Sequence, residues 1–418
     1  MGASVRAIAL PANQTRSASQ EAAALHLQHI PPMSSRHSTM HQQLYILANP
    51  LAPPPLQRSI EGAELHCSSD MELLCNAPAH ATVPDRYVFP PEKRAALQLD
   101  NDLTPDDITL PIIDLHHGAL SDDRRNQVAA EIIAAGKEFG FFQVVNHGVE
   151  EDAVQAFRDA AAGFFALPAK EKLPYCSYDM SKRFRLATST SYDRGETRYW
   201  RDYVKFRCYP ASDDNVRCWP SKPASFAPRL VEYCEAVHVL AQTLLGLIAE
   251  GLGLDARFFA GDLSGGDTHM SVNYYPPCPD PSVTMGLLAH CDRHLLTLLS
   301  QADVAGLQAR HGGRWLLVRP IQGSFVVNFG HQMEIVTNGV LASVEHRAVT
   351  NSTAARMSVA THVHPTDGCV IRPAPELVDE AENPAKYREF LFSEFMEAYD
   401  AADASRDDVL NSFKIRRG

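Results

Sequence analysis

The sequence feature that most constrains the fold is a series of short apolar runs, separated by turn residues, that begins after Thr268. Runs of about four to eight residues rich in β-branched and aromatic side chains are typical of β-strands. Turns are indicated by His311-Gly312-Gly313 and Thr337-Asn338-Gly339. The expected strands cover Met270–Tyr275, Gly286–His290, Leu295–Ser300, Leu307–Arg310, Trp315–Val318, Ser324–Phe329, Ala342–His346 and Met357–Val363. Many short strands at close spacing favour a jelly-roll, or double-stranded β-helix, core.

Helical patterns dominate the chain before this core. Residues 122–138 and 153–165 predict amphipathic helices, and residues 226–252 predict a long apolar one. Short strands are expected over 111–115 and 141–145. Helices ahead of a β core, with further helices flanking it, make the fold α+β. We expect an N-terminal region of helices and strands over 86–255, the β core over 256–400 and a tail over 401–418. A last helix is expected over 385–401.

Residues 1–85 differ in composition from the rest. They are rich in Ser, Ala, Pro, Gln and His, and Glu21 is the only acidic residue before Glu61. Such a segment offers little periodic apolar surface, so we predict a disordered extension. A Ser-rich segment with few acidic residues is also typical of an organelle transit peptide. An alternative is that the natural start is Met71 and that the start codon upstream is wrongly assigned.

Charge and cysteine content argue against several classes of protein. The net charge of −12 does not suit binding to nucleic acid, which needs a basic surface. No run of apolar residues is long enough to predict a membrane span. The nine cysteines are widely spaced and form no CxxC pair, which indicates a reducing compartment. We therefore expect a cytoplasmic monomer with a small-molecule partner, located in the plastid if the transit peptide is real.

Three residues are candidates for a metal site. His290 and Asp292 lie two residues apart, a spacing that puts both side chains on one face of a strand, and the same-face residues that follow them become mostly apolar. His346 is the candidate third ligand because it ends another predicted strand. Two His and one carboxylate leave positions open on the metal, which is the arrangement of non-haem iron(II) oxygenases, whereas a structural zinc site has four protein ligands. A rival set on one strand face is His362 and His364 with Asp367 nearby, and His-x-Asp also occurs by chance.

Arg356 and Ser358 are candidates for an anion site. They face the same side of a predicted strand, and a guanidinium and a hydroxyl inside a barrel need an acidic ligand. The distal carboxylate of 2-oxoglutarate fits, with its other end on iron. The alternative is a solvated edge strand. His290, Asp292 and His346 in this order and spacing favour the first interpretation.

Several motifs now combine into a resemblance. They are Pro111–Leu115, Gly140–Gly148, Asn273–Pro279, His290-x-Asp292, His346 and Arg356-x-Ser358. With them the chain, over roughly residues 85–400, resembles the plant 2-oxoglutarate- and Fe(II)-dependent dioxygenases. The resemblance implies a double-stranded β-helix, iron(II), 2-oxoglutarate as co-substrate, O2, ascorbate as a supporting reductant, and a role for Asn273 and Tyr275 in holding 2-oxoglutarate.

A closer resemblance is carried by three segments. Gly261–Gly266, HCDRHLLTLL from His290 and VVNFGHQMEIVTNG from Val326 are similar to mugineic-acid-type dioxygenases of grasses and, less closely, to hyoscyamine 6-hydroxylase. Many family members have Gly-Asp where this chain has Gly330-His331, and His362 and His364 are outside the general pattern. These departures leave the reaction class intact and leave the substrate open.

The expected function is therefore hydroxylation or desaturation of a small specialised metabolite. A catalytically silent sensor on the same fold and a metal-dependent hydrolase are the alternatives. Leu296, Leu298, Val327 and Phe329 are either apolar walls that exclude water or plain core. Candidate substrate contacts, although residues of this kind are more often packing residues, are Tyr192, Tyr199, Trp200, Tyr203, Phe206 and His331. Arg201 and Lys205 could meet an acidic substrate, whereas strand alternation turns Arg293 away.

Overall fold

The computed structural model describes residues 71–77, 79–94, 109–116, 121–189, 197–402 and 406–416. The interpretation of residues 1–70 as a disordered extension or transit peptide lies outside the described residues, as does Tyr192. Residues 71–77 and 79–85, which we also expected to be disordered, carry short 3-10 helices at Leu74–Asn76 and Asp85–Tyr87. Leu73 and Leu74 are buried, so that part of the expectation is wrong.

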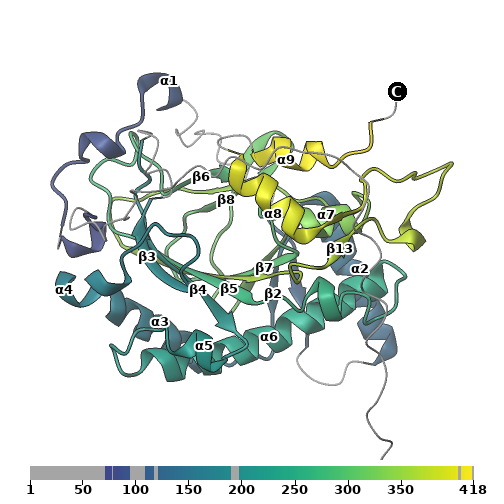
Figure 1. Cartoon of the computed structure of the whole chain (residues 1–418), viewed down its shortest axis with the longest axis horizontal. Coiled ribbons are helices and arrows are strands. Elements are labelled where there is room, and N and C mark those ends of the chain that lie inside the picture. The colour runs from purple at the N-terminus through teal and green to yellow at the C-terminus, as the bar shows by residue number, and fades with distance from the viewer. Residues whose placement is uncertain are drawn as a thin grey trace, which may run out of the picture. The chain divides into compact units, whose positions relative to one another are not determined.

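Two antiparallel sheets form the core of the described chain (Figure 1). The large sheet has the order β1-β2-β10-β7-β12-β5-β4-β3, in which only the β1–β2 pair is parallel. Its strands are β1 Ile112–Asp114, β2 Phe141–Val145, β3 Phe184–Thr188, β4 Asp202–Tyr209, β5 Thr268–Tyr275, β7 Leu296–Gln301, β10 Phe325–Phe329 and β12 Arg356–Val363. The small sheet has the order β6-β11-β8-β9 and contains β6 Leu287–His290, β8 Leu307–His311, β9 Arg314–Leu317 and β11 His346–Ala348. The jelly-roll core and the α+β class are confirmed.

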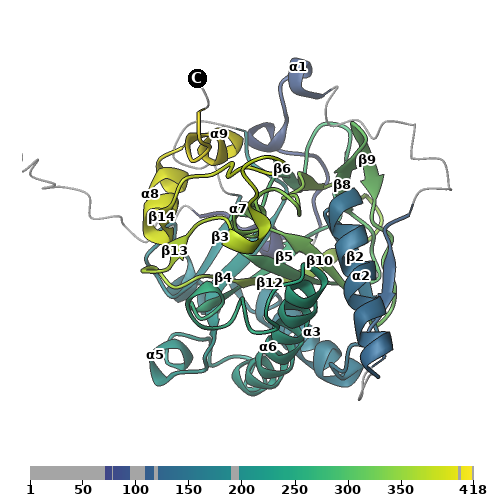
Figure 2. The same cartoon turned by 90° about the vertical axis from the view of Figure 1, so that its right-hand side faces the viewer.

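Helices cover the outer face of the large sheet (Figure 1 and Figure 2). Helix α2 spans Asp122–Glu138, as predicted, and begins where the Ser121 hydroxyl accepts a hydrogen bond from the Arg124 amide. Helix α3 spans Glu151–Phe165 and helix α6 spans Phe226–Gly251. Helix α6 is long and apolar enough for a membrane span, but its buried side chains pack against α2, α3 and β4.

The two faces of the large sheet differ in chemistry. On the outer face, alternate residues such as Val204, Val272 and Leu298 join the main core with the helices. Each fully buried aliphatic side chain of this kind contributes about 1.5–3 kcal/mol. The inner face, opposite the small sheet, carries mostly polar side chains. They are Arg185 of β3; Tyr203, Lys205 and Arg207 of β4; His269, Ser271, Asn273 and Tyr275 of β5; Arg356, Ser358 and His362 of β12; Thr297 and Gln301 of β7; and Asn328 of β10.

A smaller apolar cluster lies between the sheets. It joins Leu299, Val326 and Ala360 of the large sheet to Leu307 and Ala309 of β8. This cluster packs the two sheets together on one side. The polar residues of the inner face lie in the rest of the space between the sheets.

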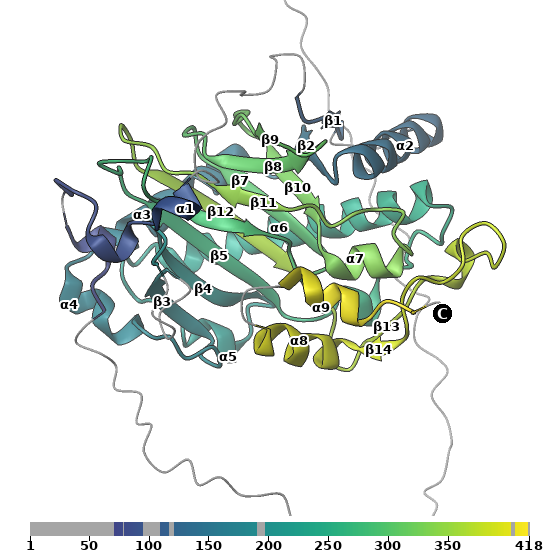
Figure 3. The same ribbon diagram turned by 90° about the horizontal axis from the view of Figure 1, so that it is seen from above.

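The remaining elements flank the core (Figure 3). They are the helices α1 Pro91–Arg94, α4 Ala169–Lys172, α5 Asp213–Val216, α7 His331–Val336, α8 Phe392–Ala401 and α9 Arg406–Ser412, the 3-10 helices Leu173–Tyr175, Gly261–Leu263 and Pro375–Leu377, and the strands β13 Val370–Ile371 and β14 Phe390–Leu391. The helix expected over 385–401 is shorter, because Phe390–Leu391 pairs as β14 with β13.

Two strand predictions are wrong in detail. The strand expected over Ala342–His346 begins only at His346, so His346 opens β11 instead of ending a strand. Asp292 lies outside a strand, because β6 ends at His290 and β7 begins at Leu296. The intervening turn reverses the alternation, so Leu296 and Leu298 point to the helices and not to the barrel interior. Together with Val327 and Phe329, they are plain core.

Candidate active site

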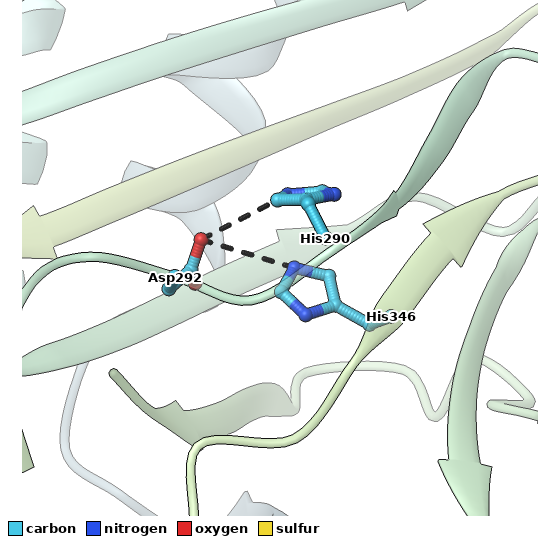
Figure 4. A group of neighbouring side chains, drawn as sticks. All are labelled: His290, Asp292 and His346. Carbon is cyan, nitrogen blue, oxygen red and sulfur yellow. Dashed lines mark ion pairs between the residues drawn. The ribbon is translucent and has the colours of Figure 1, made fainter. Parts of the chain in front are cut away.

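His290, Asp292 and His346 come together between the sheets (Figure 4). His290 and His346 are paired across β6 and β11, which places the two rings side by side with centroids 4.2 Å apart. Asp292 Oδ1 lies 3.9 Å from His290 Nε2 and 3.8 Å from His346 Nε2. The three ligand atoms lie within 4.8 Å of one another, so the group can hold one metal ion.

The protonation of the two imidazoles suits a metal. His290 Nδ1 lies 2.9 Å from the Leu288 carbonyl oxygen, and His346 Nδ1 lies 3.2 Å from the Val344 carbonyl oxygen. A carbonyl only accepts, so each Nδ1 carries the proton and each Nε2 presents its lone pair. Backbone carbonyls that orient metal-binding histidines in this way are a recurrent feature of metal sites.

The second oxygen of Asp292 is held by two donors. Thr297 Oγ1 donates to Oδ2 at 2.6 Å and Asn328 Nδ2 donates to it at 2.8 Å. These bonds turn Oδ1 toward the histidines. Burial raises the pKa of Asp292, but His346, His362, His290 and the Thr297 bond outweigh it and hold that pKa well below its usual range. The carboxylate is therefore ionised, as a metal ligand must be.

Helix α7 positions the turn that carries Asp292. The amides of Gly330 and His331 donate to the carbonyls of Leu295 and Asp292, at 3.2 and 2.8 Å. A Cβ at Gly330 would lie 1.9 Å from the His294 carbonyl oxygen, so only glycine allows this approach. Gly330 and the buried His331 therefore act on the site through the backbone.

Arg356, Ser358, Asn273 and Tyr275 also lie together on the inner face. Arg356 is opposite Tyr275, and Ser358 is opposite Asn273, in the pairing of β12 with β5. Arg356 is 2% exposed, its guanidinium carbon lies 5.1 Å from the Tyr275 ring centroid, and burial lowers its pKa. Nη2 donates to Gln301 Oε1 at 3.4 Å, and Nε has no hydrogen-bond partner among the described residues.

A buried guanidinium without a carboxylate needs an acidic ligand. In the described part of the chain Arg356 forms no ion pair, so the group fits the distal carboxylate of a 2-oxoacid whose other end lies on a metal at the triad. Gln301, Thr297 and Asn328 are site residues that the sequence reasoning missed. Gln301 lies opposite Ser358 in the pairing of β12 with β7, so the strand register was the signal needed to find it.

The rival histidines form a different group. His362 and His364 join His294 and His269, with neighbouring ring centroids 4.1–4.3 Å apart, and Asp292, His294 and His362 could also hold an ion. Burial lowers the pKa of His294, and the neighbouring His364 and His362, with Arg293 and Lys205, lower it further. Asp367 is exposed and is absent from the metal-binding groups of the described residues.

Most aromatic candidates for substrate contact are packing residues. Trp200 is buried against Tyr87 and donates its indole N–H to the Pro276 carbonyl, and Phe206 lies in the main core. Tyr199 stacks on Phe89, whereas Tyr203 lies on the inner face beneath the Arg201 guanidinium. A cleft of about 890 Å³ lies elsewhere, lined by residues that include Asn146, Arg158 and Phe325, and it contains none of the predicted ligands.

A jelly-roll with an open two-histidine, one-carboxylate group beside a buried arginine defines a non-haem iron(II) oxygenase that uses a 2-oxoacid. Residues 266–365 match the 2OG-Fe(II) oxygenase superfamily, and residues 110–228 match the N-terminal region of the non-haem dioxygenases described as in morphine synthesis. The chain belongs to the 2-oxoglutarate- and Fe(II)-dependent dioxygenases, which confirms the enzyme class and its cofactors.

Individual relatives agree with this membership. The chain is 41% identical to 2′-deoxymugineic-acid 2′-dioxygenase of Hordeum vulgare over 79% of its own length and 94% of the relative. It is 36% identical to hyoscyamine 6-dioxygenase of Hyoscyamus niger over 80% of its length and 96% of the relative. Among solved structures, JOX2 in complex with 2OG, Fe and JA superposes with a TM-score of 0.70 and 30% identity, covering 82% of this chain and 96% of JOX2. The resemblance inferred from the motifs is confirmed.

Proposed function

We propose that this dioxygenase hydroxylates or desaturates a small specialised metabolite, and that a mugineic-acid-like amino acid derivative is the first candidate. The observation that carries the proposal is the pair of groups on facing sheets: a metal triad, and a buried Arg356 that lacks a carboxylate partner among the described residues. The candidate substrate comes from the relative that acts on 2′-deoxymugineic acid.

Each site residue has a role in this proposal. His290, Asp292 and His346 would hold iron(II), and three protein ligands would leave room for 2-oxoglutarate and O2. Arg356 and Ser358 bind the distal carboxylate of 2-oxoglutarate, with Tyr275 against the guanidinium and Asn273 beside Ser358. Thr297 and Asn328 keep the second oxygen of Asp292 away from the metal.

Iron(II) and 2-oxoglutarate, when bound, supply O2 activation: 2-oxoglutarate, O2 and a substrate C–H bond become succinate, CO2 and an alcohol, with one oxygen atom in each of succinate and the alcohol. The protein positions the partners. Arg356 lies on the large sheet and the two histidines of the triad lie on the small sheet, so the two groups would hold opposite ends of 2-oxoglutarate, and α7 holds the turn of Asp292. The apolar cluster around Leu299 limits water on one side.

The test is succinate release by the purified protein with Fe(II), ascorbate and 2-oxoglutarate. The panel contains 2′-deoxymugineic acid, hyoscyamine and amino-acid-derived carboxylic acids, each with its methyl ester where one can be made. We expect succinate that rises with at least one compound and is absent in Asp292→Ala. If 2-oxoglutarate and iron bind but no compound stimulates turnover and no uncoupled succinate forms, the proposal is wrong.

A further inference from the structure

Two cations lie side by side on the inner face, away from the 2-oxoglutarate residues. Arg185 of β3 is opposite Lys205 of β4, and Lys205 is opposite Ser271 of β5. Ser271 is two residues from Asn273, so its side chain and that of Lys205 face the same side as Asn273 and Ser358. Both cations therefore share the face that carries the proposed co-substrate residues.

These two charges have no acidic partner in the described residues. Arg185 is buried, and its recorded side-chain contact is with the sulfur of Met180. Lys205 is half-buried, and no hydrogen bond or ion pair joins it to a residue that the structure describes. The carboxylates whose charge raises the pKa of Lys205 are Asp292 and Asp400. Asp292 belongs to the triad, and Asp400 forms an ion pair with Arg293 at 3.0 Å.

An unpaired cation in such a place is unfavourable unless a ligand neutralises it. Burial lowers the pKa of Lys205 well below its usual value, and the charges of Arg293 and Arg185 lower it further. A bound anion would reverse this shift, because opposite charge favours the ammonium form.

Nearby polar atoms also lack partners. His294 Nδ1 and His364 Nε2 are buried and have no hydrogen-bond partner among the described residues. Both rings lie in the histidine group that includes His269, which is opposite Arg207 of β4 and two residues from Ser271. A ligand at Lys205 with hydrogen-bonding groups would satisfy these atoms as well.

We propose that Arg185 and Lys205 bind an acidic group of the substrate, so that the enzyme selects organic acids whose carboxylate lies away from the carbon that is oxidised. The proposal rests on the proposed function and names the substrate class. It differs from the role of Arg356, which binds the co-substrate. The histidine group then contacts the polar atoms of the same acid.

The test compares acids with their methyl esters in the protein loaded anaerobically with Fe(II) and 2-oxoglutarate. The variants are Lys205→Met, which removes the charge at similar volume, Lys205→Arg, which keeps it, and Lys137→Met, which removes an exposed charge on α2. The readouts are the thermal shift caused by each compound and, for compounds that are turned over, KM and kcat for succinate release.

We expect at least one acid to stabilise the parent more than its ester. Lys205→Met should lose that difference and raise the KM for the acid about tenfold or more, because a hydrogen bond to a charged group is lost. Lys205→Arg and Lys137→Met should retain it. Lys205→Met without substrate should unfold at the same temperature as the parent or higher, since the change removes an unpaired charge from a half-buried position.

Either of two results overturns the inference: esters that bind as well as their acids, or a Lys205→Met variant that keeps the preference. Failure of the proposed function is distinguishable, because it is seen as an absence of succinate release with every compound while Fe(II) and 2-oxoglutarate alone still cause their thermal shift. That shift should be unchanged in Lys205→Met.

Discussion

At the scale of single residues, the candidate site contains buried polar groups whose hydrogen-bonding capacity the described residues leave unsatisfied. Arg356 is the strongest case, because its guanidinium is buried with Nε free of any described partner. Arg356→Lys keeps the charge but removes the planar fork. We expect affinity for 2-oxoglutarate to fall about 10- to 100-fold, which corresponds to about 1.5–3 kcal/mol for hydrogen bonds to a charged group.

Titration of 2-oxoglutarate into the Fe(II)-loaded protein, followed by the visible charge-transfer band, measures this affinity. The matched control is Arg372→Lys, since Arg372 is exposed and pairs with Glu389 at the surface. An equal loss in both variants would count against a co-substrate role for Arg356.

Thr297 donates a hydrogen bond to Asp292, so we expect it to affect iron binding through that carboxylate. Thr297→Val removes the donor to Oδ2 at nearly constant volume and leaves the three ligands in place. Groups that orient metal ligands typically contribute 10- to 100-fold to affinity, so we expect a loss of about that size in Fe(II) affinity. Thr284→Val is the control, because the buried Thr284 hydroxyl has no partner among the described residues. Unchanged metal affinity in Thr297→Val would refute the positioning role.

At the scale of elements, the contact between α7 and the turn of residues 291–295 decides where Asp292 lies. Gly330→Ala places a methyl group 1.9 Å from a backbone oxygen that cannot move alone. We expect weaker Fe(II) binding together with a loss of stability of about 1–3 kcal/mol. Urea unfolding and metal titration measure the two effects. Gly368→Ala meets no atom within 4 Å and should change stability by less than about 0.5 kcal/mol.

The segment 71–77 is attached to the sheet by Asp202. The amides of Leu74 and Cys75 donate to the two carboxylate oxygens, at 3.1 and 2.7 Å, and Asp202 is fully buried. Asp202→Asn replaces one acceptor by a donor, so we expect a loss of about 1–3 kcal/mol in unfolding free energy. Asp367→Asn, at an exposed position, is the control in urea unfolding and should also leave iron binding intact. An Asp202→Asn variant as stable as the parent would show that the two bonds contribute little.

Local patterns predicted most elements, and long-range contacts explain the errors. Helix α2 and six strands of the large sheet, β1, β2, β5, β7, β10 and β12, follow from periodicity and capping, which involve neighbours in sequence, whereas β3 and β4 were not predicted. The order and spacing of His290, Asp292 and His346 were sufficient to indicate a metal group. The reversal of alternation after His290, the late start of β11 and the attachment of residues 71–77 each depend on partners far along the chain, which no local pattern contains.

At the scale of the whole molecule, ligand binding should be visible as stability. A ligand at about 100 times its dissociation constant adds about 2.7 kcal/mol to the folded state. Fe(II) and 2-oxoglutarate added without O2 should therefore raise the melting temperature by about 5 °C or more, and a chelator should reverse it. Asp292→Ala should lose the metal-dependent shift. A shift that persists in that variant would place the metal elsewhere.

The alternation along β4 has an evolutionary consequence. Val204, Phe206 and Cys208 meet the helices, whereas Tyr203, Lys205 and Arg207 lie on the inner face, on the same side as Asn273 and Ser358. If the second set contacts substrate as we propose for Lys205, we expect heritable changes there to alter the substrate at a smaller cost in folding free energy than changes at the first set. A family built on this sheet can therefore diversify its chemistry one inward-facing position at a time, while selection for a stable fold acts on the neighbours between.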